Sequence, residues 1–124
     1  MLHREVTAVA TSVAAAHGAT AVVSIEHGPP PIVNPEREAG WAREAAIRVL
    51  GEGNVVPFGV TNMGGEDFAC YLERIGGCFL RIGAREPGGD PAPAHSPRFT
   101  AAEDSIFVGA AVLAECARVA SDNL

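Results

Sequence analysis

Gly28 to Pro31 form a run of one glycine and three prolines that interrupts the chain near its N-terminal end. Each proline fixes its φ angle and lacks a backbone N–H, so neither a helix nor the interior of a sheet can continue through this run. The 124 residues are therefore divided into residues 1–33 and residues 34–124. A chain of this length holds one ordinary domain rather than two. We expect residues 1–33 to be the end of one unit and residues 34–124 to be the larger part of another.

The residues before this break have the patterns of one helix and one strand. From His3 to Ala16, valines and alanines repeat at three- and four-residue steps, which predicts an amphipathic helix that ends before Gly18. From Thr20 to Glu26, every second residue is apolar and most of the residues between them are polar, which predicts a strand with one polar side.

Helix and strand patterns also alternate after the break. Asn34 is a suitable N-cap and Pro35 fits a first helical position, so a helix is predicted that ends at Gly51. Short strands are predicted at 55–59 and 77–83. The alternation predicts α/β layering.

Two more helices complete the predicted pattern. One opens at residues 64–67, whose acidic side chains suit the positive end of a helix dipole. The other follows Thr100 and Glu103, which have the spacing of a capping box. Its apolar residues are expected on one face, and they are Ile106, Phe107, Ala110, Leu113, Ala114 and Ala117. Between these helices, residues 84–98 contain four prolines and no periodicity, which predicts a long loop.

Composition excludes several classes of protein. Fifteen acidic and nine basic residues give a net charge of −6, and the scattered basic residues do not form a nucleic-acid surface. No apolar run approaches the roughly 20 residues that cross a bilayer, and no signal-peptide pattern follows the charged start, so we expect a cytoplasmic protein. Three cysteines without C-x-x-C spacing indicate neither disulfides nor a cysteine zinc site, and we expect them to be buried.

Two places have residues suited to chemistry. Gly64 and Gly65 precede a predicted helix, where exposed backbone N–H groups can bind an anion, although such glycines also serve simply as a turn. Glu66 beside them can face a substrate or only stabilise the helix dipole. His95 lies in the proline-rich loop, outside any apolar stripe, so its imidazole is either a metal ligand or a solvated surface group. No G-x-S-x-G nucleophile motif is present.

Four motifs follow one another along the chain, and together they resemble one family. The motifs are Pro30-Pro31-Ile32-Val33-Asn34, Gly64-Gly65-Glu66-Asp67-Phe68, Phe79-Leu80-Arg81-Ile82-Gly83 and His95-Ser96-Pro97-Arg98-Phe99, with Glu103 and Gly109 after them. In this order they are similar to the C-terminal portion of metallo-amidohydrolases of the peptidase M20 type. These include hippurate hydrolase, indole-acetyl-amino-acid hydrolases and N-acyl-amino-acid amidohydrolases. The resemblance covers nearly the whole chain.

The resemblance implies a fold and a partial site. Residues 1–33 would be the last helix and strand of an inserted α+β lid domain that also dimerises. Residues 34–124 would be the C-terminal part of an aminopeptidase-like, three-layer α/β catalytic domain. His95 would be a terminal ligand to one of two divalent metal ions (zinc, manganese or cobalt), while Gly64, Gly65 and Glu66 would lie on the substrate side. The activity implied is hydrolysis of the amide bond of N-acyl amino acids or small peptide-like substrates by metal-activated water.

The sequence also departs from this family. The other metal ligands and the general base of such enzymes have no counterpart in these 124 residues, so no catalytic residue is assigned. A catalytic zinc needs about three protein ligands, which His95 alone does not supply. We therefore expect the chain to be inactive alone and to need the N-terminal half of the catalytic domain as its partner. The alternative is a non-catalytic α/β interaction or structural module with a solvated His95.

Overall fold

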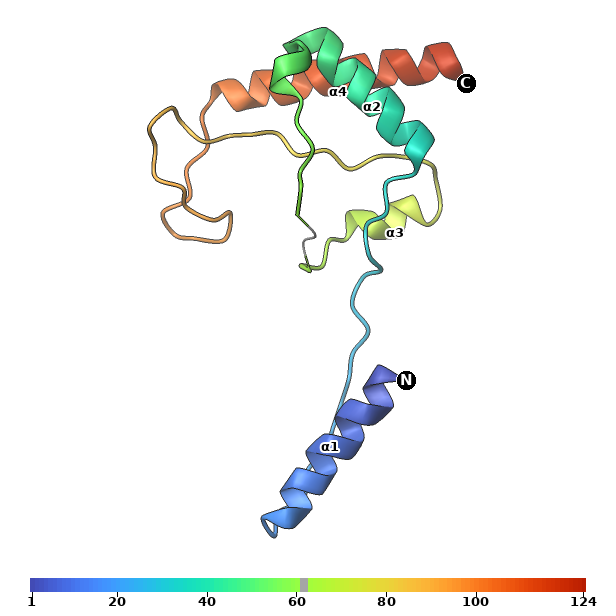
Figure 1. Cartoon of the computed structure of the whole chain (residues 1–124), viewed down its shortest axis with the longest axis vertical. Coiled ribbons are helices and arrows are strands. Elements are labelled where there is room, and N and C mark those ends of the chain that lie inside the picture. Colours follow the sequence, from blue (N-terminus) through green and yellow to red (C-terminus); the bar gives the residue numbers. More distant parts are fainter. Residues whose placement is uncertain (61–62) are drawn as a thin grey trace.

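Two long helices pack against each other and carry most of the buried core. The structure is a computed structural model, and it describes residues 1–60 and 63–124. Helix α2 (Glu36–Leu50) crosses helix α4 (Asp104–Asn123) in Figure 1. Small residues on α2 allow this close approach. The buried apolar residues are Ala42, Ala45 and Ala46 of α2, Val112 and Val119 of α4, and Ala69 of the short helix α3 (Phe68–Leu72).

Charged side chains at the rim also join α2 to α4. The guanidinium of Arg48, which pairs with Glu44 on its own helix, lies 3.3 Å from a carboxylate oxygen of Glu115 on α4. Arg118 donates to both carboxylate oxygens of Glu115, at 2.7 and 2.9 Å. These arginines hold the pKa of Glu115 below its ordinary value, the hydrogen bond from Arg118 being the larger cause.

The N-terminal helix forms an arm that projects away from the other helices (Figure 1). Helix α1 (Leu2–Ala16) ends at a turn, and the following residues run back alongside it. In this returning segment Ala21, Val23 and Ile25 are half-buried, whereas Val22 is 96% exposed. The predicted helix and the predicted alternation of faces are both confirmed.

The predicted strands are not formed. Within residues 1–60 and 63–124 no residue belongs to a strand, so the expectations of strands at 20–26, 55–59 and 77–83 are wrong for this structure. The 3₁₀-helix η1 (Glu52–Asn54) precedes the second of these segments. The physical reason is that a strand exists only when a neighbour accepts its backbone hydrogen bonds, and each segment here lies without such a neighbour. The layered α/β architecture is thus not visible in the described residues, which are helical or irregular.

The sequence predicted that Asn34 caps α2, and this prediction is wrong. The helix begins at Glu36, and Pro35 precedes it without any side-chain cap. The Asn34 amide instead donates to the carbonyl of Phe79 at 2.9 Å, and the Phe79 N–H donates back to its oxygen at 2.8 Å. A side-chain amide has the same donor and acceptor as a peptide, so it pairs with segment 77–83 as one residue of an adjacent strand would.

The final helix and its shared apolar face are confirmed, but the predicted capping box is not formed. Helix α4 begins after Glu103 with no side-chain cap; Ser105, rather than Thr100, hydrogen bonds near its start, to the Ala102 carbonyl at 2.6 Å. The expected apolar stripe faces outward, with Ile106 70%, Phe107 73% and Leu113 67% exposed. The opposite face packs on α2. Helix α4 is therefore apolar on both sides.

The cysteines are less buried than expected. Cys70 is exposed, and Cys78 and Cys116 are half-buried. Burial is the main cause that raises the pKa of both half-buried thiols. Among the described residues, no helix has the length and apolar character needed to cross a membrane.

Candidate functional site

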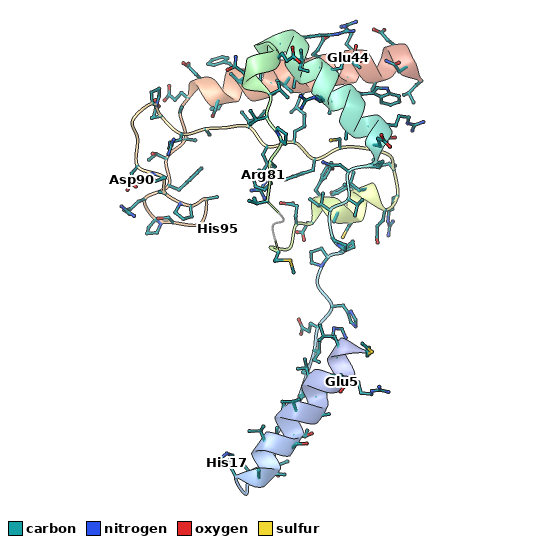
Figure 2. All side chains as sticks on the ribbon, viewed as in Figure 1. Glu5, His17, Glu44, Arg81, Asp90 and His95 are labelled. Carbon is teal, nitrogen blue, oxygen red and sulfur yellow. The ribbon has the colours of Figure 1, made fainter. Side chains whose placement is uncertain are left out.

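His95 lies in a turn within the predicted long loop. Three hydrogen bonds shape this turn: Ser96 N–H to the Pro93 carbonyl at 2.9 Å, Phe99 N–H to the Ser96 carbonyl at 3.0 Å, and Arg98 N–H to the Ser96 hydroxyl at 3.1 Å. His95 is exposed, and Figure 2 shows it at the edge of the molecule. The local sequence therefore fixes the backbone next to the imidazole while leaving the ring accessible.

Two further contacts hold the loop around this turn. Asp90 accepts a hydrogen bond from Arg98 at 2.5 Å, across eight residues of chain. The Ala102 N–H donates to the Ala84 carbonyl at 2.8 Å, so the two ends of the loop meet. A long loop with closed ends and internal hydrogen bonds is a frequent carrier of functional residues.

The glycine-rich motif makes local packing and backbone contacts. A methyl group added at Gly65 would lie 3.3 Å from Cγ of Pro29, so the absence of a side chain lets the proline run pack here. The Glu66 carboxylate accepts a hydrogen bond from the Phe68 N–H at 3.2 Å, at the start of α3. It thereby satisfies one N–H group that the short helix leaves free. The contacts of Gly65 and Glu66 are those of a turn and a cap, which was the simpler of the two interpretations.

The predicted site residues are not joined by direct polar contacts where these contacts are described. Within residues 1–60 and 63–124, no hydrogen bond or ion pair joins His95 to Gly65 or Glu66. The same residues contain no group of three or more histidine, cysteine, aspartate or glutamate side chains that could hold a metal ion. One exposed imidazole is too few donors for a zinc site, which uses about four ligands. The residues present therefore do not fit a metal ion by themselves.

A cavity that the sequence did not indicate lies beside the loop. Its volume is about 280 Å³, and its charged lining residues are Arg81, Arg85 and Asp90. Arg81 also stacks on Phe58, with its guanidinium carbon 4.6 Å from the ring centroid. The sequence analysis treated Arg81 only as part of a strand, and nothing in its spacing from Arg85 signalled a shared cavity.

Comparison with known proteins identifies the chain's relatives. Residues 4–119 match the profile of Peptidase family M20/M25/M40, which is nearly the whole chain. The chain belongs to this family. Members are generally metal-dependent, and membership fits an α/β peptidase fold. The resemblance recognised in the four sequence motifs is thereby confirmed.

Individual relatives give the same result. The chain is 33% identical to the putative amidohydrolase YhaA of Bacillus subtilis, over 94% of the chain and 30% of that protein. It is 35% identical to N-acetyl-L-cysteine deacetylase of B. subtilis, over 94% of the chain and 26% of that protein. It is 40% identical to IAA-amino acid hydrolase ILR1-like 6 of Arabidopsis thaliana, over 71% of the chain and 19% of that protein. The chain thus spans less than a third of the length of these relatives. No solved structure matches it at a significant level.

Proposed function

We propose that this chain is the C-terminal part of a metal-dependent amidohydrolase that acts on N-acyl amino acids or small peptide-like substrates. The observation that supports the proposal most is the family match over residues 4–119. One relative is named an amidohydrolase, and the names of the other two, a deacetylase of N-acetyl-L-cysteine and a hydrolase of IAA–amino acids, refer to amino-acid conjugates. The acyl group and the amino acid that this protein uses are left open.

His95 is the residue through which the chain would take part in the reaction. Its ring is exposed and has no hydrogen-bond partner among the described residues, so a nitrogen is available to a metal ion. Bound there, zinc, manganese or cobalt would supply Lewis-acid chemistry. The remaining ligands and the general base would come from an N-terminal half of the catalytic domain. A cytoplasmic location and dimerisation through the arm remain predictions.

The isolated chain is expected to be inactive, and complementation tests the proposal. The chain would be co-expressed with the N-terminal portion of B. subtilis N-acetyl-L-cysteine deacetylase that it lacks, and hydrolysis of a panel of N-acetyl amino acids would be measured in the copurified pair. We expect metal-dependent release of acetate by the pair and none by either part. His95→Ala should abolish that activity, whereas His17→Ala, which changes an exposed histidine on the arm, should not.

Two results would contradict this proposal. Equal activity of the His95→Ala and unaltered pairs would return His95 to the class of solvated loop residues. A copurified pair that bound metal yet hydrolysed no N-acyl amino acid would favour the non-catalytic module. The exposed apolar face of α4 is the observation that keeps this second candidate in view, because such a face suits association with another polypeptide.

A further inference from the structure

Two arginine side chains that line the cavity beside the loop have no acidic partner among the described residues. Within residues 1–60 and 63–124, neither Arg81 nor Arg85 forms an ion pair. Asp90, the one acidic residue among the described residues that line the cavity, is already paired with Arg98 at 2.5 Å. The positive charge of the two guanidinium groups is therefore not offset by the cavity's own carboxylate. The chain as a whole carries a net charge of −6, so this local excess of positive charge runs against the overall balance.

The position of Arg81 is partly fixed before any ligand arrives. Its guanidinium carbon lies 4.6 Å from the centroid of the Phe58 ring, and such a cation–π contact on the face of the group is compatible with hydrogen bonds from its edge. Arginine presents several N–H donors in a planar fork that matches the two oxygens of a carboxylate. A group held in advance loses less conformational freedom when it binds.

The remaining lining is mainly apolar. Ile82, Pro91 and Phe99 form walls next to the arginines, together with small alanine side chains. Phe99 is 45% exposed, so a ligand could cover apolar surface that water now contacts. The volume of about 280 Å³ is close to the lower limit of ligand sites, roughly 300 Å³, which suits a group of amino-acid size.

We propose that this cavity binds the free carboxylate of an N-acyl amino acid, with Arg81 and Arg85 as donors and Phe99 against the apolar part of the ligand. The carboxylate is the end of such a molecule that hydrolysis leaves unchanged, so these arginines are binding and specificity residues. The choice of this ligand rests on the proposed function. All the residues that would recognise the carboxylate belong to this chain, and none of them acts through a metal ion.

Binding can be measured on the chain as it stands. The probe is N-acetyl-L-phenylalanine, titrated into the labelled protein in the presence of EDTA and followed by changes in amide chemical shifts. We expect shifts at residues 81–85 and 90–100, and affinity at least about tenfold weaker for N-acetyl-L-phenylalaninamide, which lacks the carboxylate. Inorganic phosphate at the same concentration should not displace the probe, because it cannot use the apolar wall.

Substitutions locate the effect. Arg81→Gln and Arg85→Gln should each weaken binding at least about tenfold, while Arg81→Lys, which keeps the charge but loses the fork, should give an intermediate affinity. Arg43→Gln is the matched control, because Arg43 is an exposed arginine of α2 with no ion pair among the described residues. Circular dichroism confirms that each variant retains its helices.

The outcomes separate this proposal from the proposed function. Equal affinity for acid and amide, unchanged affinity in both glutamine variants, or displacement by phosphate would each overturn the carboxylate site. Metal-free binding with the expected variant pattern supports the site even if the complemented pair hydrolyses nothing. A pair that hydrolyses N-acyl amino acids equally well with Arg81→Gln and Arg85→Gln would support the amidohydrolase and overturn the role of this cavity.

Discussion

Asn34 and the Phe79 peptide are joined by two hydrogen bonds of 2.9 and 2.8 Å across 45 residues of sequence. Segment 77–83 has no strand beside it, so this side chain supplies the backbone partner that the segment otherwise lacks. The contact ties the start of α2 to the segment that leads to the arginine cavity. It is one of the few long-range polar contacts among the described residues.

Removing the Asn34 side chain should make the backbone of segment 77–83 more mobile. Asn34→Ala is expected to cost about 1 kcal/mol of stability and to speed amide hydrogen exchange at Phe79. Asn34→Asp keeps an oxygen that accepts from the Phe79 N–H but loses the donor to its carbonyl, so exchange should remain slower than in the alanine variant. Exchange followed by nuclear magnetic resonance checks both. Equal rates in all three proteins would mean that the contact does not hold the segment in solution.

Glu115 should make stability depend on pH in the acid range. Arg118 first, and Arg48 after it, lower its pKa in the folded chain. A lowered folded pKa gives a stabilising contribution that is complete above the unfolded pKa, about 4.3, and is lost as pH falls through the lower folded pKa. Urea unfolding between about pH 3 and pH 7 should therefore show a smaller acid loss in Glu115→Gln than in the unaltered chain.

A matched substitution tests whether this loss of stability at acid pH comes from the contacts of Glu115 with the two arginines. Glu52→Gln removes an exposed carboxylate that has no arginine partner among the described residues, so it should leave the pH profile nearly unchanged. Because the pairs are partly exposed, the difference at Glu115 should shrink in high salt. A steeper acid loss in Glu115→Gln would reverse the assigned sign.

The two faces of α4 should respond differently to truncation. Val112 is 1% exposed against α2, so Val112→Ala should cost roughly 2 kcal/mol, from two buried methyl groups and the space they leave. Leu113 is 67% exposed, so Leu113→Ala should change the stability of the isolated chain by less than about 0.5 kcal/mol. Chemical unfolding of the two variants measures the contrast.

The same pair of substitutions reports on what covers the outer face. If the N-terminal half of the catalytic domain packs on that face, Leu113→Ala should become clearly destabilising in the copurified pair. An unchanged small effect there would show that the outer face of α4 stays in water. Equal costs of the two substitutions in the isolated chain would contradict the observed packing.

The helices were predictable from the sequence because the residue patterns that favour a helix lie within the helix itself. The apolar repeats before Gly18 and Gly51 are contained in the helices themselves, and α1 and α2 formed where expected. The orientation of α4 was not predictable, because Val112 and Leu113 give it apolar residues on both sides and periodicity does not choose between them. Strands failed for a different reason: segment 20–26 has the right alternation, but a strand needs a paired neighbour, and none lies beside this segment among the described residues.

The molecule as a whole has a small core for its length. In the described part of the chain six apolar residues are buried, four of them alanines, while many large apolar side chains are exposed. This is what a piece spanning less than a third of its relatives' length would show. The composition is typical of a globular protein because the apolar residues are present, although most of the large ones are not packed in a core.

The candidate site was only partly predictable at this scale. His95 could be recognised because its motif is short and local, and the structure places it in an accessible turn. Its role as a metal ligand stays a prediction, since no group of side chains that could hold a metal ion is found in residues 1–60 and 63–124. Arg81 and Arg85 were missed because they become neighbours of Asp90 and Phe99 only when the long loop folds back on segment 81–85.

The contact between Gly65 and Pro29 lies at the root of the N-terminal arm. Helix α1 has 15 residues, which at 1.5 Å per residue extend for about 22 Å, and the stiff proline run connects it to the rest of the chain. Pro29 packs closely on Gly65, where an added Cβ would be 3.3 Å from its ring and would require a shift of a few tenths of an ångström. This contact therefore lies where the arm joins the rest of the molecule. A shift of a few tenths of an ångström at this contact would be multiplied along the arm, so a side chain at residue 65 would move the distant tip of α1 further than it moves Pro29.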